Sequence, residues 1–544
     1  MNAPAPAIEG LSACRIVMSG RVQGVGFRPF VYRIALAHGV AGWVRNETGK
    51  VVILAEGAPT ALEAFARALL VEAPPLAKPQ LESRAETVPQ GAQGFHILKS
   101  AEAAEADIHL PPDLFCCPDC VAELHDRAAR RHAYAFTNCT QCGPRYTIIE
   151  SLPYDRPHTS MAGFALCPAC RAEYENPLDR RFHAQPLACP ECGPQLSFVL
   201  GGEERATGAA ALAATLDVLR AGGVVAAKGV GGYHLLCDAA SDAAIAKLRA
   251  RKHRPHKPLA VMLPFAGADG LDSVRRHAVP ATEEADAIRD PARPIVLVRK
   301  RADATLGKGL APGLGELGVF LPYSPLHVLL LEGFGAPLVA TSGNISGEPV
   351  LTDEGQAQAR LSGIADAFLH HNRPIVRPAD DSVVRIIGGR PRPIRLGRGI
   401  APLEIDLPSP LAEPTLAVGG HMKGAIALGW GKRAVVSPHI GELDSVRSLE
   451  VFAQVINDLQ RLYRVEARRV ICDAHPRYAS TRWAKACSLP VIAVQHHAAH
   501  AAALAGEYPD VRRWLVFAWD GVGLGEDSEL WGGEAFCGAP GGWR

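Results

Sequence analysis

Eight cysteines in the first half of the chain have the spacing of metal ligands. They occur as four C-x-x-C pairs, which form two copies of C-x2-C-x18-C-x2-C placed fifty residues apart. The ligand positions are Cys117, Cys120, Cys139 and Cys142 in the first copy and Cys167, Cys170, Cys189 and Cys192 in the second. Four thiolates suit one tetrahedral zinc ion and leave no coordination position open for catalysis. The spacing therefore predicts two structural Zn(II) sites.

Thioredoxin-like redox chemistry is the alternative interpretation of a C-x-x-C pair. A second pair in each copy argues against it. The surrounding residues also repeat, because both copies contain C-P-x-C-x-A-E and the pair Arg130 and Arg131 corresponds to Arg180 and Arg181. This correspondence indicates an internal duplication. Since zinc segments are common interaction modules, a non-catalytic zinc scaffold is a further hypothesis.

A second group of residues has the chemistry of an anion site. The glycine-rich segment RVQGVGFR, residues 21–28, lies between a predicted strand and a predicted amphipathic helix. Glycines at such a junction let backbone N–H groups converge on a phosphate, and Arg28 adds a bidentate donor. An ordinary tight turn would use the same glycines. The predicted elements over residues 12–100 follow the order βαββαβ, with the last strand at 95–100, which indicates a ferredoxin-like fold.

This first unit resembles the acylphosphatases. The resemblance lies in G-x-V-Q-G-V-G-F-R and in the strand W-V-R-N that follows it. It implies that Arg28 holds the phosphate and that Asn46 orients the attacking water. An acyl phosphate is already activated, so positioning and charge neutralisation can be enough for its hydrolysis without a protein base.

A basic run precedes an apolar strand in the third unit, where helices and apolar strands alternate as in an α/β domain. The run at 249–257 follows a predicted helix at 210–223 and a buried strand at 224–239. A solvated basic face is the ordinary interpretation of such a run. The unit resembles the YrdC family through its K-x-R and S-x-N signatures. The resemblance implies that ATP, with Mg(II), is bound and converted to an adenylate by Lys252, Arg254, Ser342 and Asn344.

The last unit follows a proline-rich linker at 401–414 and opens with a glycine turn between two apolar strands. Its His496 and His500 are spaced i, i+4 and fall on one face of a helix, and Asp520 ends an apolar strand. A structural role is the ordinary interpretation of a histidine pair on an alanine-rich helix. The motifs H-x-x-x-H and D-G-x-G-x-G resemble the threonylcarbamoyl-transferase-like proteins. That resemblance implies that these three residues bind iron or zinc.

The predicted architecture is multidomain, α/β and α+β. Its units are a ferredoxin-like acylphosphatase domain at 10–100, a tandem four-cysteine zinc segment at 107–198, a YrdC-like domain at 205–400 and a metal domain of the actin-like ATPase fold at 412–544. The four units in this order resemble the HypF family of hydrogenase maturation carbamoyltransferases. Because the chain ends at Arg544, shortly after W-G-G-E-A-F, we expect the last domain to be incomplete, and transfer is the step that this would affect.

The resemblance implies an enzyme that hydrolyses carbamoyl phosphate, forms carbamoyl adenylate from ATP and releases pyrophosphate and AMP. The carbamoyl group would pass to the C-terminal cysteine of the partner protein HypE, as the precursor of the cyanide ligands of [NiFe] hydrogenase. An alternative is an enzyme of the tRNA threonylcarbamoyl-adenosine pathway, in which the basic run would contact RNA.

Composition excludes several other classes. Among 544 residues, 57 Lys and Arg balance 56 Asp and Glu, so no overall charge attracts DNA or an acidic membrane. The first ten residues lack the pattern of a signal peptide, and no apolar stretch is long enough to cross a bilayer without interruption. We therefore expect a globular cytoplasmic protein with reduced cysteines.

Overall fold

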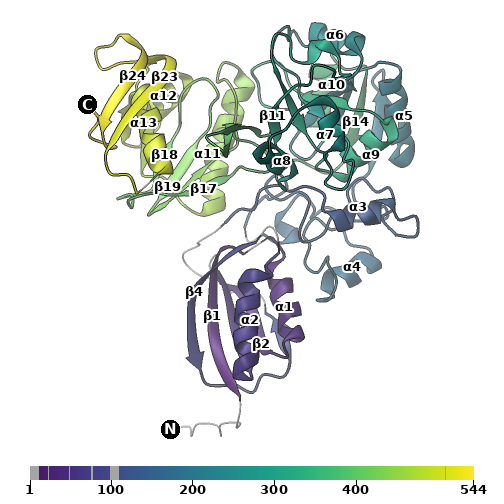
Figure 1. Ribbon diagram of the computed structural model, residues 1–544, viewed down its shortest axis with the longest axis vertical. Helices are drawn as coiled ribbons and strands as arrows, with labels where there is room; N and C mark the ends of the chain where they lie inside the picture. The colour runs from purple at the N-terminus through teal and green to yellow at the C-terminus, as the bar shows by residue number, and fades with distance from the viewer. Residues whose placement is uncertain are drawn as a thin grey trace.

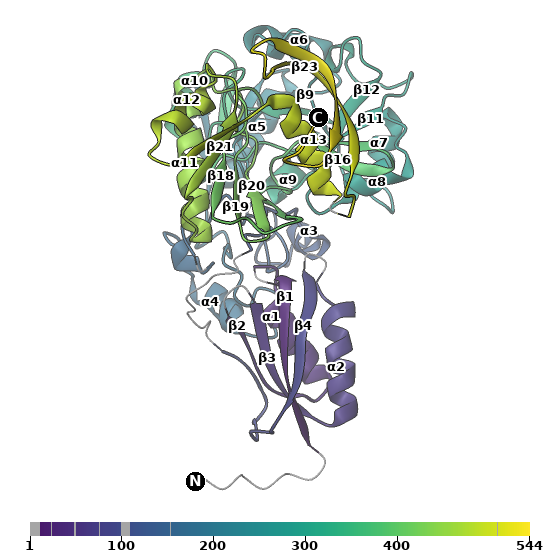
Figure 2. The same cartoon turned by 90° about the vertical axis from the view of Figure 1, so that its left-hand side faces the viewer.

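The computed structural model describes residues 11–22, 24–47, 50–74, 77–98, 109–152, 154–508 and 510–544. The predicted absence of a signal peptide concerns residues 1–10, which lie outside this range, as do Gln23 of the glycine-rich segment and residues 48–49 of a predicted turn. The chain forms three lobes, and the cysteine-rich segment lies where they meet (Figure 1). In the turned view, this segment lies between the N-terminal lobe and the rest of the molecule (Figure 2).

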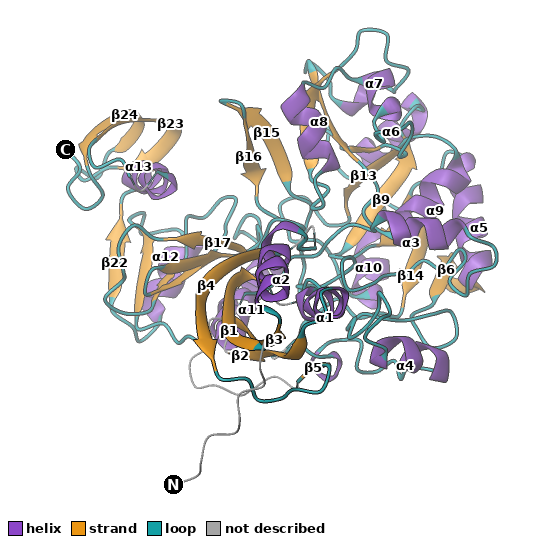
Figure 3. Cartoon of the chain, turned by 60° about the horizontal axis from the view of Figure 1, so that its bottom comes forward, coloured by secondary structure: helices purple, strands orange, loops and turns teal. Residues whose placement is uncertain are grey.

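The N-terminal lobe is a five-stranded sheet, in the order β4-β1-β3-β2-β5, with two helices. Its elements are β1 (Ser12–Arg21), α1 (Phe27–Ala37), β2 (Ala41–Glu47), β3 (Lys50–Gly57), α2 (Pro59–Val71), β4 (Lys78–Thr87) and β5 (Phe95–Ile97). Both helices lie beside the sheet (Figure 3) and bury their apolar sides against it, as Phe30 and Phe65 show. The ferredoxin-like fold is confirmed.

One strand of this lobe is missing from the sequence prediction. The strand that pairs with β1 at the edge of the sheet is β4, whereas the predicted last strand at 95–100 is the short β5 beside β2. Almost all of β4 is exposed, and charged residues such as Glu82 and Arg84 follow one another along it. A solvated edge strand of this kind has no apolar alternation by which to recognise it.

The cysteine-rich segment contains few regular elements. They are α3 (Pro118–His125), α4 (Pro168–Glu175) and the 3-10 turn η1 (Arg156–His158). Each of the two α-helices begins with a proline directly after the first cysteine of its copy, Cys117 or Cys167. Proline suits the first helical position because its missing N–H would have no partner there. The two copies thus fold in the same way.

An eleven-stranded mixed sheet forms the third unit, in the order β16-β15-β11-β12-β10-β13-β9-β8-β14-β6-β7. Its elements are β6 (Leu196–Leu200), β7 (Glu203–Thr207), α5 (Gly208–Arg220), β8 (Val225–Lys228), β9 (Tyr233–Asp238), α6 (Asp242–Arg251), β10 (Val261–Met262), α7 (Asp272–His277), α8 (Thr282–Arg289), β11 (Ile295–Arg299), η2 (Lys308–Leu310), β12 (Glu316–Phe320), α9 (Pro325–Phe334), β13 (Leu338–Ser342), α10 (Glu354–Leu361), β14 (Ala367–His371), β15 (Val383–Ile387) and β16 (Arg390–Arg395). The single strand predicted at 224–239 is wrong. It is an antiparallel pair, β8 and β9, because the glycines between Lys228 and Tyr233 form a turn.

The last unit has a six-stranded sheet, β17-β20-β19-β18-β21-β22, and a separate hairpin of β23 and β24. Its elements are β17 (Leu403–Asp406), β18 (Thr415–Ala417), β19 (Ala427–Trp430), β20 (Arg433–Val436), α11 (Val446–Tyr463), β21 (Arg469–Asp473), α12 (Ala479–Ala486), β22 (Val491–Val494), α13 (His496–Glu507), β23 (Trp514–Leu524) and β24 (Leu530–Gly538).

Two sequence predictions differ from this part of the fold. The segment taken as a proline-rich linker contains β17, which pairs with β20 in the last sheet. Asp520 does not end its strand but lies inside β23, where the pairing with β24 is irregular. The glycines around it permit this distortion of the strand.

Candidate functional site

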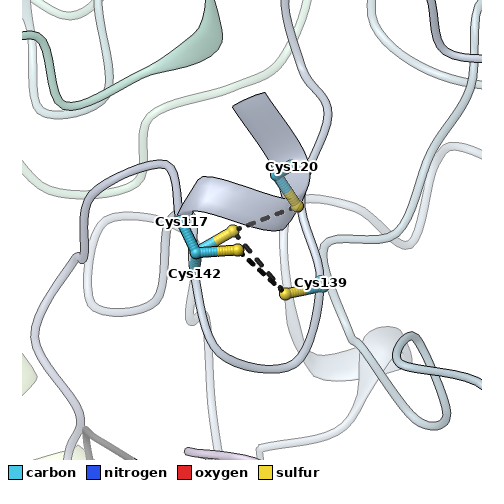
Figure 4. Close-up of side chains that lie close together, drawn as sticks. All are labelled: Cys117, Cys120, Cys139 and Cys142. Atoms are coloured by element: carbon cyan, nitrogen blue, oxygen red, sulfur yellow. Dashed lines mark hydrogen bonds between the residues drawn. The ribbon is translucent and has the colours of Figure 1, made fainter. Parts of the chain in front are cut away.

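The structure brings the two predicted sets of cysteine ligands together. In the first set the sulfur atoms of Cys117 and Cys139 are 3.7 Å apart, and that of Cys142 lies 3.5 Å from Cys120 and 3.8 Å from Cys139. All four side chains point toward one centre (Figure 4). A tetrahedral zinc ion with Zn–S bonds of about 2.3 Å requires sulfur atoms roughly 3.8 Å apart. The second set has 3.7 and 3.8 Å between neighbouring sulfurs, so both sets fit zinc.

Arg28 and Asn46 occupy neighbouring elements of the N-terminal lobe. Arg28 lies in the first turn of α1, a helix that begins directly after the left-handed Gly26 (φ 74°), and α1 packs against β2, which carries Asn46. Burial lowers the pKa of Arg28, while the nearby Asp155 opposes this change. Among the described residues, the buried Oδ1 of Asn46 accepts no hydrogen bond.

The cysteine-rich segment packs directly on the glycine-rich loop of this lobe. Arg145 donates a hydrogen bond from Nε to the carbonyl of Gly24 (3.1 Å). A Cβ atom on Gly24 would lie 2.7 Å from Pro111, and one on Gly26 would lie 3.0 Å from the hydroxyl of Thr140. The loop therefore needs glycine both for its left-handed backbone and for this contact. Nothing in the local sequence indicated these partners.

Three of the four predicted ATP-binding residues form one hydrogen-bonded group. The Lys252 ammonium donates to the carbonyl oxygens of Ser342 and Asn344 (both 2.7 Å) and to Asn344 Oδ1 (2.9 Å). The Ser342 hydroxyl donates to the same Oδ1 (2.8 Å). Burial lowers the pKa of Lys252 to about 7, with a further contribution from Arg254. The K-x-R and S-x-N signatures, ninety residues apart, thus meet in space.

Arg254 lies beside this group, where the third and last units face each other. Its guanidinium donates to the carbonyl of Pro258 (2.6 Å), and burial, together with Arg395, lowers its pKa to about 10. Arg395 is paired with Asp380. The last unit contacts this region, since the backbone amide of His439 donates a hydrogen bond to the carbonyl of Leu396 (2.7 Å). The sequence analysis did not identify Asp380, Arg395 or His439.

The predicted metal ligands of the last unit also converge. His496 Nε2 lies 2.9 Å and His500 Nε2 3.3 Å from the same oxygen of Asp520. This donor set, two imidazoles and one carboxylate, fits a zinc or ferrous ion that retains open positions. Asp473, at the end of β21, lies 2.7 Å from His496 Nδ1 and orients that ring. The sequence analysis did not identify Asp473, because nothing in the local segment D-A-H-P links it to a histidine 23 positions later.

Comparisons with known proteins agree with this arrangement. The chain matches the acylphosphatase family over residues 14–97, the HypF finger over 116–149 and 166–199, the Sua5, YciO and YrdC family over 217–397, and the HypF Kae1-like domain over 410–507. It is 45% identical to the carbamoyltransferase HypF of Synechocystis over 98% of this chain and 69% of that protein. The chain belongs to the HypF family of carbamoyltransferases. It is 47% identical to the Rhodobacter capsulatus HypF, over 97% of this chain and 70% of that one.

The structure of this HypF-family chain is also similar to solved structures. A crystal structure of full-length HypF in a phosphate- and nucleotide-bound form superposes with a TM-score of 0.91 at 40% identity, covering 98% of this chain and 70% of that one. The crystal structure of the T. kodakarensis HypF gives a TM-score of 0.87 at 38% identity over 97% of this chain and 68% of that one. Among the helices of the described residues, none combines the length and the apolar composition of a membrane-spanning segment.

Proposed function

We propose that this carbamoyltransferase uses carbamoyl phosphate and ATP as substrates and works through three sites, which lie in units at 10–100, 205–400 and 412–544. The zinc segment at 107–198 connects them. The observation that carries this proposal is the meeting of Lys252 with Ser342 and Asn344, since it builds an anion-binding group from two signatures far apart in the sequence. The free thiols that both zinc sites require suit the cytoplasm.

The first step is hydrolysis of carbamoyl phosphate in the N-terminal lobe. Arg28 binds the phosphoryl oxygens together with backbone N–H groups of the glycine-rich loop. Asn46 holds a water molecule through its buried Oδ1, which accepts no hydrogen bond from the described residues. Attack of that water on phosphorus breaks the bond to the acyl oxygen and releases phosphate and carbamate.

The second step forms carbamoyl adenylate in the YrdC-like unit. A carbamate oxygen attacks the α-phosphorus of ATP, and pyrophosphate leaves with its Mg(II) ion. Lys252 and Arg254 balance the negative charge of the phosphates, and Ser342 and Asn344 hydrogen-bond to phosphate or acyl oxygens. The group lies near the contact between the third and last units, where the amide of Glu442 donates to the carbonyl of Gly347, three residues after Asn344.

The third step transfers the carbamoyl group. His496, His500 and Asp520 would hold an iron or zinc ion, which supplies a positive charge for the nucleotide phosphate when bound. The acceptor is the C-terminal cysteine thiolate of HypE. It attacks the carbamoyl carbon, AMP leaves, and a thiocarboxamide remains on the partner protein.

One incubation series tests the whole sequence. The protein is mixed with ATP and carbamoyl phosphate, with and without HypE, and phosphate, pyrophosphate, AMP and the thiocarboxamide are measured. We expect pyrophosphate release to depend on carbamoyl phosphate, and AMP and thiocarboxamide to appear with HypE. Pyrophosphate release that requires threonine and bicarbonate instead would favour the tRNA pathway. No reaction with either set of substrates would contradict both.

A further inference from the structure

The arginines of each cysteine copy contact the metal site of the other copy. Arg130 belongs to the first copy, but its Nη1 donates to the sulfur of Cys170 in the second (3.2 Å). Arg180 belongs to the second copy, and its Nη1 donates to the sulfur of Cys120 in the first (3.0 Å). These four residues are two pairs related by fifty positions. The contact is therefore reciprocal.

Carboxylates and backbone carbonyls of each copy also accept hydrogen bonds from the arginines of the other copy. Glu173 of the second copy accepts hydrogen bonds from Arg130 (2.7 Å) and Arg131 (2.5 Å) of the first. In the opposite direction, Glu123 is paired with Arg180 and Arg181. The buried Arg131 also donates to the carbonyl of Ala188 (2.7 Å), and Arg181 donates to that of Asn138 (3.1 Å), in each case the residue before the third cysteine.

The charge of a four-thiolate zinc site explains why such contacts matter. One Zn(II) ion with four thiolates carries a net charge of −2, and the sulfurs of both sites are largely buried. Hydrogen bonds from a cation to a metal-bound thiolate stabilise that charge and orient the ligand. The guanidinium groups that can do this come from the opposite copy.

We propose that the two zinc sites are one coupled unit, in which the arginine pair of each copy stabilises metal binding at the other copy's four cysteines. Neither copy is then an independent zinc finger, because each lacks the cations for its own site. Each copy thus completes the surroundings of the other copy's metal site. This inference concerns metal binding and does not depend on the proposed carbamoyl transfer.

Arg130 and Arg180 are the positions at which to test it. Their side chains are 33% and 32% exposed, so replacing them does not open the core, whereas Arg131 and Arg181 are almost fully buried. Arg171 is a matched control in the same segment. Its side chain is 60% exposed and pairs with Glu175 on its own helix.

The experiment compares zinc release from the full chain and from the variants Arg130→Met, Arg180→Met and Arg171→Met. Release to a coloured chelator gives the rate, and alkylation of the freed cysteines followed by mass spectrometry shows which site has opened. We expect Arg130→Met to release zinc roughly ten- to a hundredfold faster from the site of Cys167, Cys170, Cys189 and Cys192. Arg180→Met should do the same at the site of Cys117, Cys120, Cys139 and Cys142, and Arg171→Met should match the parent chain.

The crosswise pattern separates this proposal from a general loss of stability. If each variant first loses zinc from its own copy, or if both sites open equally in both variants, the proposal is wrong. Unchanged release from both variants would also overturn it. The variant Arg130→Lys keeps the positive charge but not the planar donor group, and its effect should lie between those of Arg130→Met and the parent chain.

Discussion

At the residue scale, two opposing effects act on the charge of Lys252. It is buried, which disfavours the ammonium form, yet its Nζ donates three hydrogen bonds, which favour that form. The result is a lysine that changes charge near neutral pH, with its pKa lowered to about 7. The charge that this residue offers to a phosphate therefore depends on pH within the physiological range.

We expect the affinity of the chain for ATP to fall as the pH rises above 7. Lys252 attracts phosphate only when protonated, so above its pKa the binding of ATP must be accompanied by uptake of a proton. The dissociation constant should then rise by up to about tenfold per pH unit. Isothermal titration calorimetry between pH 6 and pH 9 measures this. Lys252→Met should bind ATP weakly and lose this pH dependence, and the half-exposed Lys247→Met should keep it. An unchanged slope in Lys252→Met would show that another group is responsible.

A second prediction concerns Arg28. Replacing it with alanine removes the cation that binds the phosphoryl group of carbamoyl phosphate. We expect the rate of phosphate release to fall by about a hundredfold or more. A phosphate-release assay checks this, with the exposed Arg67→Ala as the control. Hydrolysis at an undiminished rate in Arg28→Ala would mean that the N-terminal lobe is not the phosphatase.

At the element scale, the metal-binding group of the last unit follows from the order of its strands. β21 and β22 are parallel neighbours, so the end of β21, with Asp473, lies next to the start of α13. That helix begins with His496 directly after β22 and carries His500 one turn further on. The irregular part of β23 then brings Asp520 against both rings. Polar groups commonly gather at the carboxyl ends of parallel strands for this reason.

Asp473→Asn should weaken metal binding without removing a predicted ligand. The carboxylate holds the Nδ1 side of His496, and such partners typically contribute ten- to a hundredfold to metal affinity, so we expect a loss of roughly that size. Competition titration with Zn(II), after both cysteine sites are filled, measures it. Asp406→Asn on the exposed part of β17 is the control. Equal affinities in the two variants would contradict the role of Asp473.

At the scale of the whole molecule, the cysteine-rich segment holds the units together. It contacts the N-terminal lobe through Arg145 and the carbonyl of Gly24, and the third unit through the carbonyl of Thr147 and the amide of Val376 (2.8 Å). The fully buried Arg377 connects three units, because it is paired with Asp458 of α11 and also donates to the carbonyl of Ile149. The residues of the segment that make these contacts, Arg145, Thr147 and Ile149, follow directly after the first cysteine cluster, which ends at Cys142.

Removal of zinc should therefore destabilise the whole chain and not the segment alone. A structural zinc ion contributes on the order of 10 kcal/mol to the folding of a small domain. We expect treatment with a strong chelator to lower the thermal midpoint by at least roughly 10 °C, as measured by differential scanning calorimetry. Adding Zn(II) back should restore the midpoint, whereas Mg(II) should not. A midpoint that does not change after both ions are removed would show that the segment does not need metal.

The sequence by itself determined the features that depend on local spacing. Two cysteines three positions apart share one turn, and two histidines four positions apart share one helix face, so these ligand sets were predictable before any fold was known. The ferredoxin-like lobe was predictable from the order of its elements, and the order of the four units from the resemblance of their motifs to known families. The charged edge strand β4 was not predictable, because its sequence lacks an apolar alternation. The hairpin of β8 and β9 was not predictable either, because the apolar residues on both sides of its glycine turn have the pattern of one continuous strand.

Only the tertiary structure decided which distant residues meet. Three contacts join segments that are between 23 and 121 positions apart: Arg145 with Gly24, Asp473 with His496, and Arg130 with Cys170. Each of these contacts depends on how whole elements pack, and packing is set by the complete core and not by the residues near either partner in the sequence. The motifs thus determined which metal ligands and anion-binding residues are present. The folded arrangement determined which neighbouring groups orient these residues and balance their charge.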